Sequence, residues 1–227
     1  MIKIRVEISK GEEVRYISHL DYAGAIEKAL KRAKIPVAYS EGFNPHMKLS
    51  FASALAVGLT SANEYMEVEL KEKVDIVDFV NEFKKQLPLG IDILQAKYLT
   101  KKEKALMATV NLATYNIAVP LLGDKIEALT AIENFNKAEV VNYLKVTPKS
   151  SKEIEIKQFI KDDISFMINN NILDINMSIK ITPTGSVKPT DVLNAISEQF
   201  ALNIKYDDAL IHRTGLYVDD KSPIDLI

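Results

Sequence analysis

Residues 1–100 alternate between two hydrophobic periodicities, one typical of strands and the other of helices. Strands are predicted where short apolar stretches alternate with polar positions, at residues 2–8, 36–39, 64–70 and 91–99. Helices are predicted where apolar residues recur every three or four positions, at residues 18–33 and 76–87. The resulting order, βαββαβ, predicts two helices on one face of an antiparallel sheet, the ferredoxin-like arrangement.

The first predicted helix has a clear start, two faces and an end. Ser18 can cap it, Asp21 stands at the third helical position, and Pro36 follows its last turn. One side carries an apolar row made of Leu20, Ala23, Ile26, Leu30 and Ala33. The other side carries Glu27, Lys28, Lys31, Arg32 and Lys34. We therefore expect the row to be buried and the cations to face solvent.

The rest of the chain predicts a second, more elaborate unit. Strands are expected at residues 114–119, 140–146, 153–159, 172–181, 204–206 and 210–218. Helices are expected at residues 125–138 and 191–200, the second capped by Thr190, and residues 101–112 connect the two parts. The sequence thus predicts an α+β protein of two ferredoxin-like (βαββαβ) halves, the second elaborated, with domains at residues 1–100 and 113–227. His212 and Arg213 either face the first half across a cleft or lie at a surface strand end, and the surface position is the expected one.

Composition narrows the possible functions. The chain has no cysteine, which excludes disulfides, thiolate zinc sites and iron–sulfur ligation, so we expect no cofactor of its own. The first residues alternate between apolar and charged, unlike a signal peptide, and no apolar stretch approaches the roughly 20 residues that span a bilayer. We therefore expect a cytoplasmic protein without membrane contact. The net charge of −2 gives no global attraction to nucleic acid.

Polar and aromatic residues that a plain fold does not require are concentrated between Arg15 and Tyr65. We expect the helix start and the loop after the second strand to lie at one end of the sheet. The predicted binding residues are Arg15, Tyr16, Ser18, His19, Asp21, Arg32, Tyr39, Glu41, Asn44, His46, Lys48, Ser61 and Glu64. Cations and helix-start amides suit phosphate, while Tyr16, Tyr39 and Phe43 offer stacking faces for bases. An ordinary solvated face explains Lys28, Lys31 and Arg32 equally well.

Two catalytic interpretations use the same stretch. In metal-independent RNA cleavage, His19 or His46 would take a ribose 2′-hydroxyl proton, and Lys48 or Arg15 would stabilise the developing charge. A zinc or iron site would use His19, Asp21, Glu41 and His46, although no diagnostic ligand spacing exists. Histidines satisfied by hydrogen bonds are the simpler explanation, so His19, His46 and Lys48 remain catalytic candidates only and no metal is expected.

Three segments resemble a known family: residues 15–21, residues 35–46, and residues 55–59 with Ser61, Glu64 and Tyr65. They are similar to the radical-SAM-linked proteins, a domain found alone or joined to a radical S-adenosylmethionine protein and often encoded near a ribonuclease of the E/G type. The chain departs from the family pattern at Met47 and Ala56, where proline is usual. The resemblance implies a radical S-adenosylmethionine enzyme as partner and a link to RNA metabolism, and it supplies no catalytic residue.

These observations together predict an accessory protein rather than an enzyme. We expect it to present RNA, or another substrate, to a radical S-adenosylmethionine enzyme, in tRNA or rRNA modification. One alternative is the metal-independent endoribonuclease that uses His19 and His46. A further alternative is a small-molecule or peptide binding module.

Overall fold

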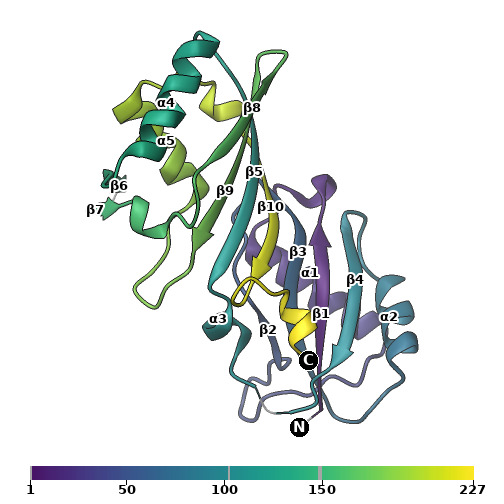
Figure 1. The fold of residues 1–227 in the computed structure, drawn as a ribbon. Coiled ribbons are helices and arrows are strands. Elements are labelled where there is room, and N and C mark those ends of the chain that lie inside the picture. The colour runs from purple at the N-terminus through teal and green to yellow at the C-terminus, as the bar shows by residue number, and fades with distance from the viewer. Residues whose placement is uncertain (1, 102, 148–149) are drawn as a thin grey trace. The chain divides into compact units, whose positions relative to one another are not determined.

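The computed structural model describes residues 2–101, 103–147 and 150–227 (Figure 1). It is a mixed α+β protein rich in antiparallel sheet, which confirms the predicted class. The chain divides into two compact units. The first consists of Met1–Asn111 with Arg213–Ile227, and the second of Leu112–His212.

Antiparallel strands form the sheet of the first unit. Strand β1 (Ile2–Lys10) lies between β3 (Leu59–Leu70) and β4 (Ile91–Tyr98), and the short β2 (Leu49–Phe51) pairs with β3. The strand predicted at residues 36–39 forms only isolated bridges, because Pro36 lacks an amide hydrogen and the chain turns back at residues 40–46. That the unit is ferredoxin-like stays a prediction.

Helices α1 (His19–Arg32) and α2 (Ile76–Lys84) supply the other side of this core. The residues packed between helices and sheet include Ile4, Val6, Ile8, Ile26, Leu30, Phe79 and Phe83. The predicted burial of Leu20 is wrong, since its side chain is 81% exposed. The buried face of α1 is instead centred on Tyr22, Ile26 and Ala29, at the i, i+4, i+7 spacing of one helix face.

The end of the chain belongs with the first unit. Strand β10 (Leu210–Tyr217) enters this unit at Arg213, and a 3-10 helix, η4 (Pro223–Leu226), follows. Tyr65 Oη lies 2.9 Å from Ser222 Oγ, and Arg5 Nη1 donates to the Pro223 carbonyl at 2.6 Å. The division therefore differs from domains at residues 1–100 and 113–227. Two further short helices are η1 (Glu12–Val14) and α3 (Leu106–Thr109), the latter in the predicted connector.

The second unit has its own antiparallel strands in the order β5-β9-β8. Its elements are β5 (Leu112–Pro120), α4 (Lys125–Lys137), β6 (Asn142–Thr147), β7 (Ser150–Glu155), η2 (Lys157–Phe159), β8 (Ser165–Asn169), β9 (Ile172–Lys180), α5 (Pro189–Phe200) and η3 (Tyr206–Asp208). β6 and β7 form a separate hairpin. β8 was not expected, and the strand predicted at residues 204–206 runs into η3. The N-cap of α5 is Lys188 rather than Thr190, and its amide donates to Asp191 Oδ2 at 3.2 Å.

Candidate nucleic-acid interface

The start of α1 is capped as the sequence predicts. The Asp21 amide donates to Ser18 Oγ at 3.1 Å, and Ser18 Oγ in turn donates to Asp21 Oδ2 at 2.6 Å. This arrangement satisfies one of the backbone amides that a helix start leaves unpaired. Ser18 and Asp21 are therefore engaged with each other, and their first role is to begin the helix.

Arg15 is buried and serves the structure of the loop before α1. Its Nε and Nη2 donate to the two carboxylate oxygens of Glu12 at 2.7 and 2.6 Å. Its Nη1 reaches the Gly58 carbonyl at 3.3 Å, and the Gly58 amide returns a bond to the Arg15 carbonyl. A guanidinium held in this two-point geometry is not available to a phosphate. Arg15 thus ties the helix start to the loop before β3.

A buried charge cluster, defined as Lys10, Glu64 and Arg213, lies next to this loop. Arg213 Nε is 2.9 Å from Glu64 Oε1, and both side chains are almost completely buried. Lys10 Nζ donates to the Arg15 carbonyl at 3.0 Å. The expected surface position of Arg213 is wrong, because the side chain is 2% exposed and must neutralise Glu64 inside the unit. Ser61 also belongs here, since its hydroxyl donates to the Arg213 carbonyl.

Burial dominates the protonation equilibria of this cluster. It raises the pKa of Glu64, although the neighbouring Arg213 and Lys10 favour the charged carboxylate. Burial also lowers the pKa of Lys10, while Glu64 acts in the opposite direction. Each charge therefore depends on the other for its stability in the interior. Removal of one partner is expected to leave the other unpaired.

His19 projects from the first turn of α1 and is half-buried. Its ring meets Phe51 edge-on, with centroids 5.1 Å apart, and within the described chain its Nδ1 has no hydrogen-bond partner. Burial lowers the pKa of His19, and the positive charges of Arg213 and Lys10 lower it further. The folded state therefore favours the neutral imidazole over the protonated one.

The second histidine candidate lies at the other end of the sheet. In the ladder between β1 and β3, Lys10 lies opposite Ser61 at one end and Lys3 lies opposite Glu69 near the other. Lys48 Nζ forms an ion pair with the Glu69 carboxylate at 3.1 Å, which places Lys48 at the second of these ends. The rise of a strand separates Glu69 from Glu64 by about 17 Å. His46 lies beyond Lys48, because the Lys48 amide bonds back to Ala38 and the Ser40 amide to the His46 carbonyl. The expectation that the helix start and this loop meet is wrong.

The loop itself is exposed and braced by its own backbone. His46 donates its amide to Ser40 Oγ at 2.9 Å. Gly42 has a φ of +116°, a conformation that L-residues rarely adopt. The loop side chains that reach solvent are Tyr39, Glu41, Phe43, Asn44 and His46. Lys71 Nζ lies 5.5 Å from the centre of the Tyr39 ring, so this aromatic face is partly engaged.

Unpaired cations are found instead on the outer face of α1. Lys28, Lys31 and Arg32 of α1 are exposed, as is Lys34 just after the helix, and no ion pair involves Lys28 or Lys31 in the described part of the chain. A groove of about 500 Å³ runs between this helix and the turn after α2. It is lined by Asp21, Ala25, Lys28 and Arg32, one helix face, and by residues 86–88. Arg32 Nη2 donates to the Gln86 carbonyl at 2.6 Å and fixes one wall.

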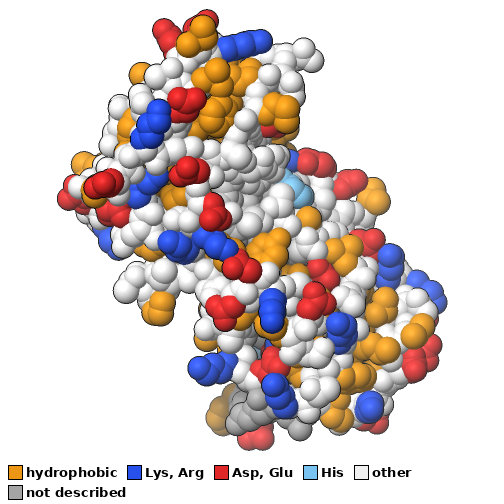
Figure 2. Space-filling view, in the orientation of Figure 1, with side chains coloured by type: hydrophobic (Ala, Val, Ile, Leu, Met, Phe, Trp, Pro, Cys, Tyr) orange, Lys and Arg blue, Asp and Glu red, His pale blue; other side chains and the backbone are white. Residues whose placement is uncertain are grey.

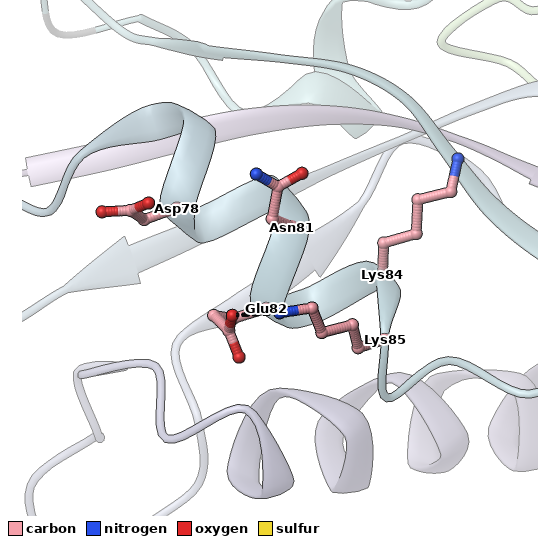
Figure 3. A pocket seen from close by; sticks show the side chains of 5 residues that line it. All are labelled: Asp78, Asn81, Glu82, Lys84 and Lys85. Carbon is pink, nitrogen blue, oxygen red and sulfur yellow. Dashed lines mark hydrogen bonds and ion pairs between the residues drawn. The ribbon is translucent and has the colours of Figure 1, made fainter.

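On the face seen in Figure 2, acidic and basic side chains are interspersed. A depression of about 510 Å³ on α2 is lined by Asp78, Asn81, Glu82, Lys84 and Lys85, all from one helix (Figure 3). Its cations are neutralised: Lys85 pairs with Glu82 at 2.6 Å and Lys84 with Asp92 at 2.7 Å. The groove beside α1 is therefore the better anion surface.

The proposed metal ligands do not gather. Among residues 2–101, 103–147 and 150–227, no three histidine or carboxylate side chains lie close enough to hold one ion. His19 and Asp21 lie at the start of α1, whereas Glu41 and His46 belong to the loop at the other end of the sheet. Across the same described residues, none of the helices is both long enough and apolar enough to span a membrane.

Comparison with known proteins assigns the chain to a family. A family model described as "Uncharacterized protein conserved in bacteria (DUF2344)" matches residues 3–189. The chain belongs to the DUF2344 family. The matched stretch includes the motif region, α1 and its basic face. A link between this DUF2344 protein and radical S-adenosylmethionine enzymes stays a prediction from the sequence resemblance. No curated protein matches the chain.

Two solved structures are similar to the DUF2344 protein. A chain of "Crystal Structure of a Cbf5-Nop10-Gar1 Complex" matches with a TM-score of 0.52 and 10% identity, over 97% of this chain and 53% of that one. A chain of "Structure of H/ACA RNP bound to a substrate RNA containing 2'-deoxyuridine" matches with a TM-score of 0.47 and 9% identity, over 92% and 46%. The DUF2344 chain thus spans about half the length of these matches, and the first likeness concerns the fold.

Proposed function

We propose that the DUF2344 protein is an RNA-binding accessory protein that presents tRNA or rRNA to a radical S-adenosylmethionine enzyme. The observation that carries the proposal is the basic face of α1, where Lys28 and Arg32 line an open groove. Lysines without ion-pair partners can neutralise phosphates and release the bound counterions, which is the main source of affinity for nucleic acid. The overall charge of −2 supplies no global attraction to RNA, so the proposal depends on this local face.

Exposed aromatic side chains, one just before α1 and one in the distant loop, supply stacking surfaces. Tyr16 is 75% exposed, and Phe43 in the distant loop is completely exposed. Aromatic faces of this kind stack on unpaired bases without regard to sequence. The basic groove would follow the RNA backbone, while Tyr16 would contact a splayed base at the start of α1. Glu41, Asn44 and His46, at the opposite end of the sheet, would form a separate contact.

The partner is proposed from the sequence resemblance and from the absence of cysteine. A radical S-adenosylmethionine enzyme holds an iron–sulfur cluster on cysteine thiolates, and this chain has none to offer. The cluster would therefore be entirely the partner's. We further propose that the first unit is a ferredoxin-like module whose helix face meets the RNA.

The endoribonuclease alternative finds less support in the geometry. It requires an acid and a base on one scissile phosphate, but the pairing of β1 with β3 separates His19 from His46. Lys48, the candidate for charge stabilisation, is paired with Glu69. A cleavage activity that is unchanged in the His19→Ala/His46→Ala double variant would eliminate this alternative completely.

The test compares two double variants with equal change in charge. Lys28→Gln/Lys31→Gln removes two unpaired cations from α1, and Lys84→Gln/Lys85→Gln removes two paired cations from α2. Binding of purified tRNA and rRNA fragments is measured as a function of salt concentration. We expect the α1 variant to lower the slope of log K against log salt by roughly 1.4, at about 0.7 per lost contact to single-stranded RNA.

The matched α2 variant is expected to keep the wild-type slope. Equal effects of the two variants would show that attraction is non-specific, and absence of RNA binding at low salt would overturn the proposal. Crosslinking with total cellular RNA would name the bound RNA. Co-purification with a radical S-adenosylmethionine enzyme encoded in the same genome tests the partner independently of the RNA.

A further inference from the structure

The helix wall of the groove beside α1 has two ends of opposite charge. Asp21 lines the groove near the start of the helix, and Lys28 and Arg32 line it further along. The helix rises by about 10 Å between Asp21 and Lys28. Phosphate groups account for the cations but not for the carboxylate, which repels them. The groove therefore suits a ligand with an anion at one end and hydrogen-bond donors at the other.

Asp21 can accept hydrogen bonds beyond those of its capping role. Its Oδ2 accepts the Ser18 hydroxyl at 2.6 Å, and among the residues that the structure describes no hydrogen bond reaches its Oδ1. The side chain is exposed. A carboxylate has about four lone-pair positions on its two oxygens. Oδ1 and the remaining lone pair of Oδ2 can thus accept two parallel hydrogen bonds from a ligand while the helix cap stays intact.

The middle of the groove is uncharged. Ala25 lies between Asp21 and Lys28 on the same helix face, and Leu87 and Pro88 line the groove from the turn after α2. These side chains bring apolar groups to both walls, where the face of a flat ring can be desolvated. The groove volume of about 500 Å³ is in the usual range of small-ligand sites. A nucleobase therefore fits the chemistry of this middle section.

The cations supply the anion contact at the far end. Arg32 uses Nη2 for the Gln86 carbonyl at 2.6 Å, which leaves other donors on its guanidinium group. Lys28 is exposed and lines the same groove. The separation of Asp21 from Lys28 along the helix is similar to the distance from the base edge of a nucleotide to its 5′-phosphate. One nucleotide can therefore contact both ends of the groove.

The carboxylate selects among the four bases, because it only accepts hydrogen bonds. Guanine presents two adjacent donors, N1–H and N2–H, which match the two oxygens of Asp21. Adenine and cytosine each present one amino donor beside a ring acceptor, and uracil presents one N–H between two carbonyl acceptors. Each of these three bases would place an acceptor against the carboxylate. The Watson–Crick edge is accessible only in an unpaired nucleotide, so the groove favours unpaired guanosine.

We propose that this groove binds an unpaired guanosine nucleotide of RNA and that Asp21 is the residue that selects it. The inference rests on the proposed RNA-binding function and adds the base that is recognised. Guanine N1–H and N2–H donate to the Asp21 carboxylate, the ring lies between Ala25 and Leu87, and the phosphate contacts Lys28. The neighbouring nucleotides then follow the basic face of α1.

Short uridine oligomers with one central guanosine, inosine or adenosine test this selection with the full chain at constant salt concentration. We expect the wild type to bind the guanosine oligomer roughly tenfold more tightly than the adenosine oligomer or the plain uridine oligomer. Inosine keeps N1–H but lacks the N2 amino group, so its oligomer should show an intermediate affinity. Equal affinities for the guanosine and adenosine oligomers would overturn the inference.

Two variants with the same change in charge identify the selecting residue. Asp21→Asn keeps an acceptor for Ser18 but replaces one carboxylate oxygen by a donor, and it should abolish the preference for guanosine. The matched control is Asp78→Asn, since Asp78 occupies the same third position in α2 and its amide bonds to the cap residue Asp75 at 3.1 Å. This control should keep the preference. A preference that survives in Asp21→Asn, or that is lost equally in both variants, would overturn the assignment.

The remaining comparisons separate this inference from the proposed function and RNA from free nucleotide. The salt slope of the Lys28→Gln/Lys31→Gln variant on the plain uridine oligomer reports on RNA binding alone, and it can change as expected even if no base is preferred. Absence of binding to every oligomer would overturn the proposed function itself. Guanosine 5′-monophosphate should compete only weakly, because it lacks the flanking phosphates. Competition as strong as that of the guanosine oligomer would identify a free nucleotide as the ligand and overturn the assignment to RNA.

Discussion

The ion pair between Arg213 and Glu64 is the contact whose removal tests the buried charge cluster most directly. In Arg213→Met an unbranched apolar side chain replaces the guanidinium, and Glu64, only 3% exposed, loses its partner at 2.9 Å. Hydrogen bonds from Arg213 to Ser53 Oγ and the Ala54 carbonyl are lost as well. Removal of one member of a buried pair destabilises proteins by about 3–5 kcal/mol, and we expect the free energy of unfolding to fall by this amount.

A double variant separates the ion pair from the packing of the two side chains. In Glu64→Leu/Arg213→Met the ion pair is removed as a whole, and Lys10 loses Glu64 but keeps its hydrogen bond to the Arg15 carbonyl, so we expect a smaller loss than the sum of the two single variants, with a coupling of about 1–3 kcal/mol. Denaturation by guanidinium at neutral pH, followed by circular dichroism, measures all members of the cycle. Strict additivity, or a loss below about 1 kcal/mol in Arg213→Met, would refute the reasoning.

The dependence on pH gives this prediction a second readout. Burial raises the pKa of Glu64 above its ordinary 4.5, and Arg213 opposes the rise. The folded state therefore holds this proton more tightly than the unfolded state, and the contribution of Glu64 to stability falls as pH rises from 4.5 through the folded pKa. In Arg213→Met the pKa of Glu64 should rise further, because the opposing positive charge is lost. The penalty of Arg213→Met should hence be smaller below pH 4.5 than at neutral pH, and equal penalties would contradict the assignment.

Three further outcomes are expected. Gly42→Val, at a φ of +116°, should lower stability by about 1–3 kcal/mol, whereas Gly24→Ala, in α1 with free space around it, should raise it by up to about 1 kcal/mol; thermal unfolding measures both. The pKa of His19 is lowered from its ordinary 6.5, so the contribution of His19 to the free energy of unfolding is present above pH 6.5 and is lost as pH falls through the folded pKa. An NMR titration of the His19 ring should give a pKa below 6.5. Leu20→Ser should change stability by less than about 0.5 kcal/mol, and Ile26→Ser by several times more, in the same denaturation assay.

The sequence predicted the elements whose signals are local. Alternation identified β1 and β3, and the Ser18 cap identified the start of α1 within one turn. Elements that depend on distant partners were missed. β8 has only five residues, and its strand form depends on pairing with β9 across a two-residue turn of Asn170 and Asn171. The pair Asn-Asn, which tolerates positive φ, was the available signal for that hairpin.

The candidate site was predicted in composition but not in arrangement. Arg15, Ser61 and Glu64 do come together, yet the partner of Glu64 is Arg213, far away along the chain, whose position facing the first half was only the less favoured of two interpretations. Sequence spacing also gave no information on which end of the sheet receives a loop. That depends on the register of β2 against β3, which places Lys48 beside Glu69 rather than beside Glu64.

The charged residues between Arg15 and Tyr65 are of two kinds, buried and exposed. A buried charge is tolerated only when it has a specific partner. The Arg15–Glu12 and Glu64–Arg213 pairs are therefore explained by their structural role in the first unit. The exposed Lys28 and Lys31 satisfy no such need. A surface lysine without a partner adds little to stability, and its value to the protein must come from solvation or from a ligand. The groove beside α1 supplies the geometry for a ligand, and for this reason the proposed function rests on the helix face rather than on the motif's buried charges.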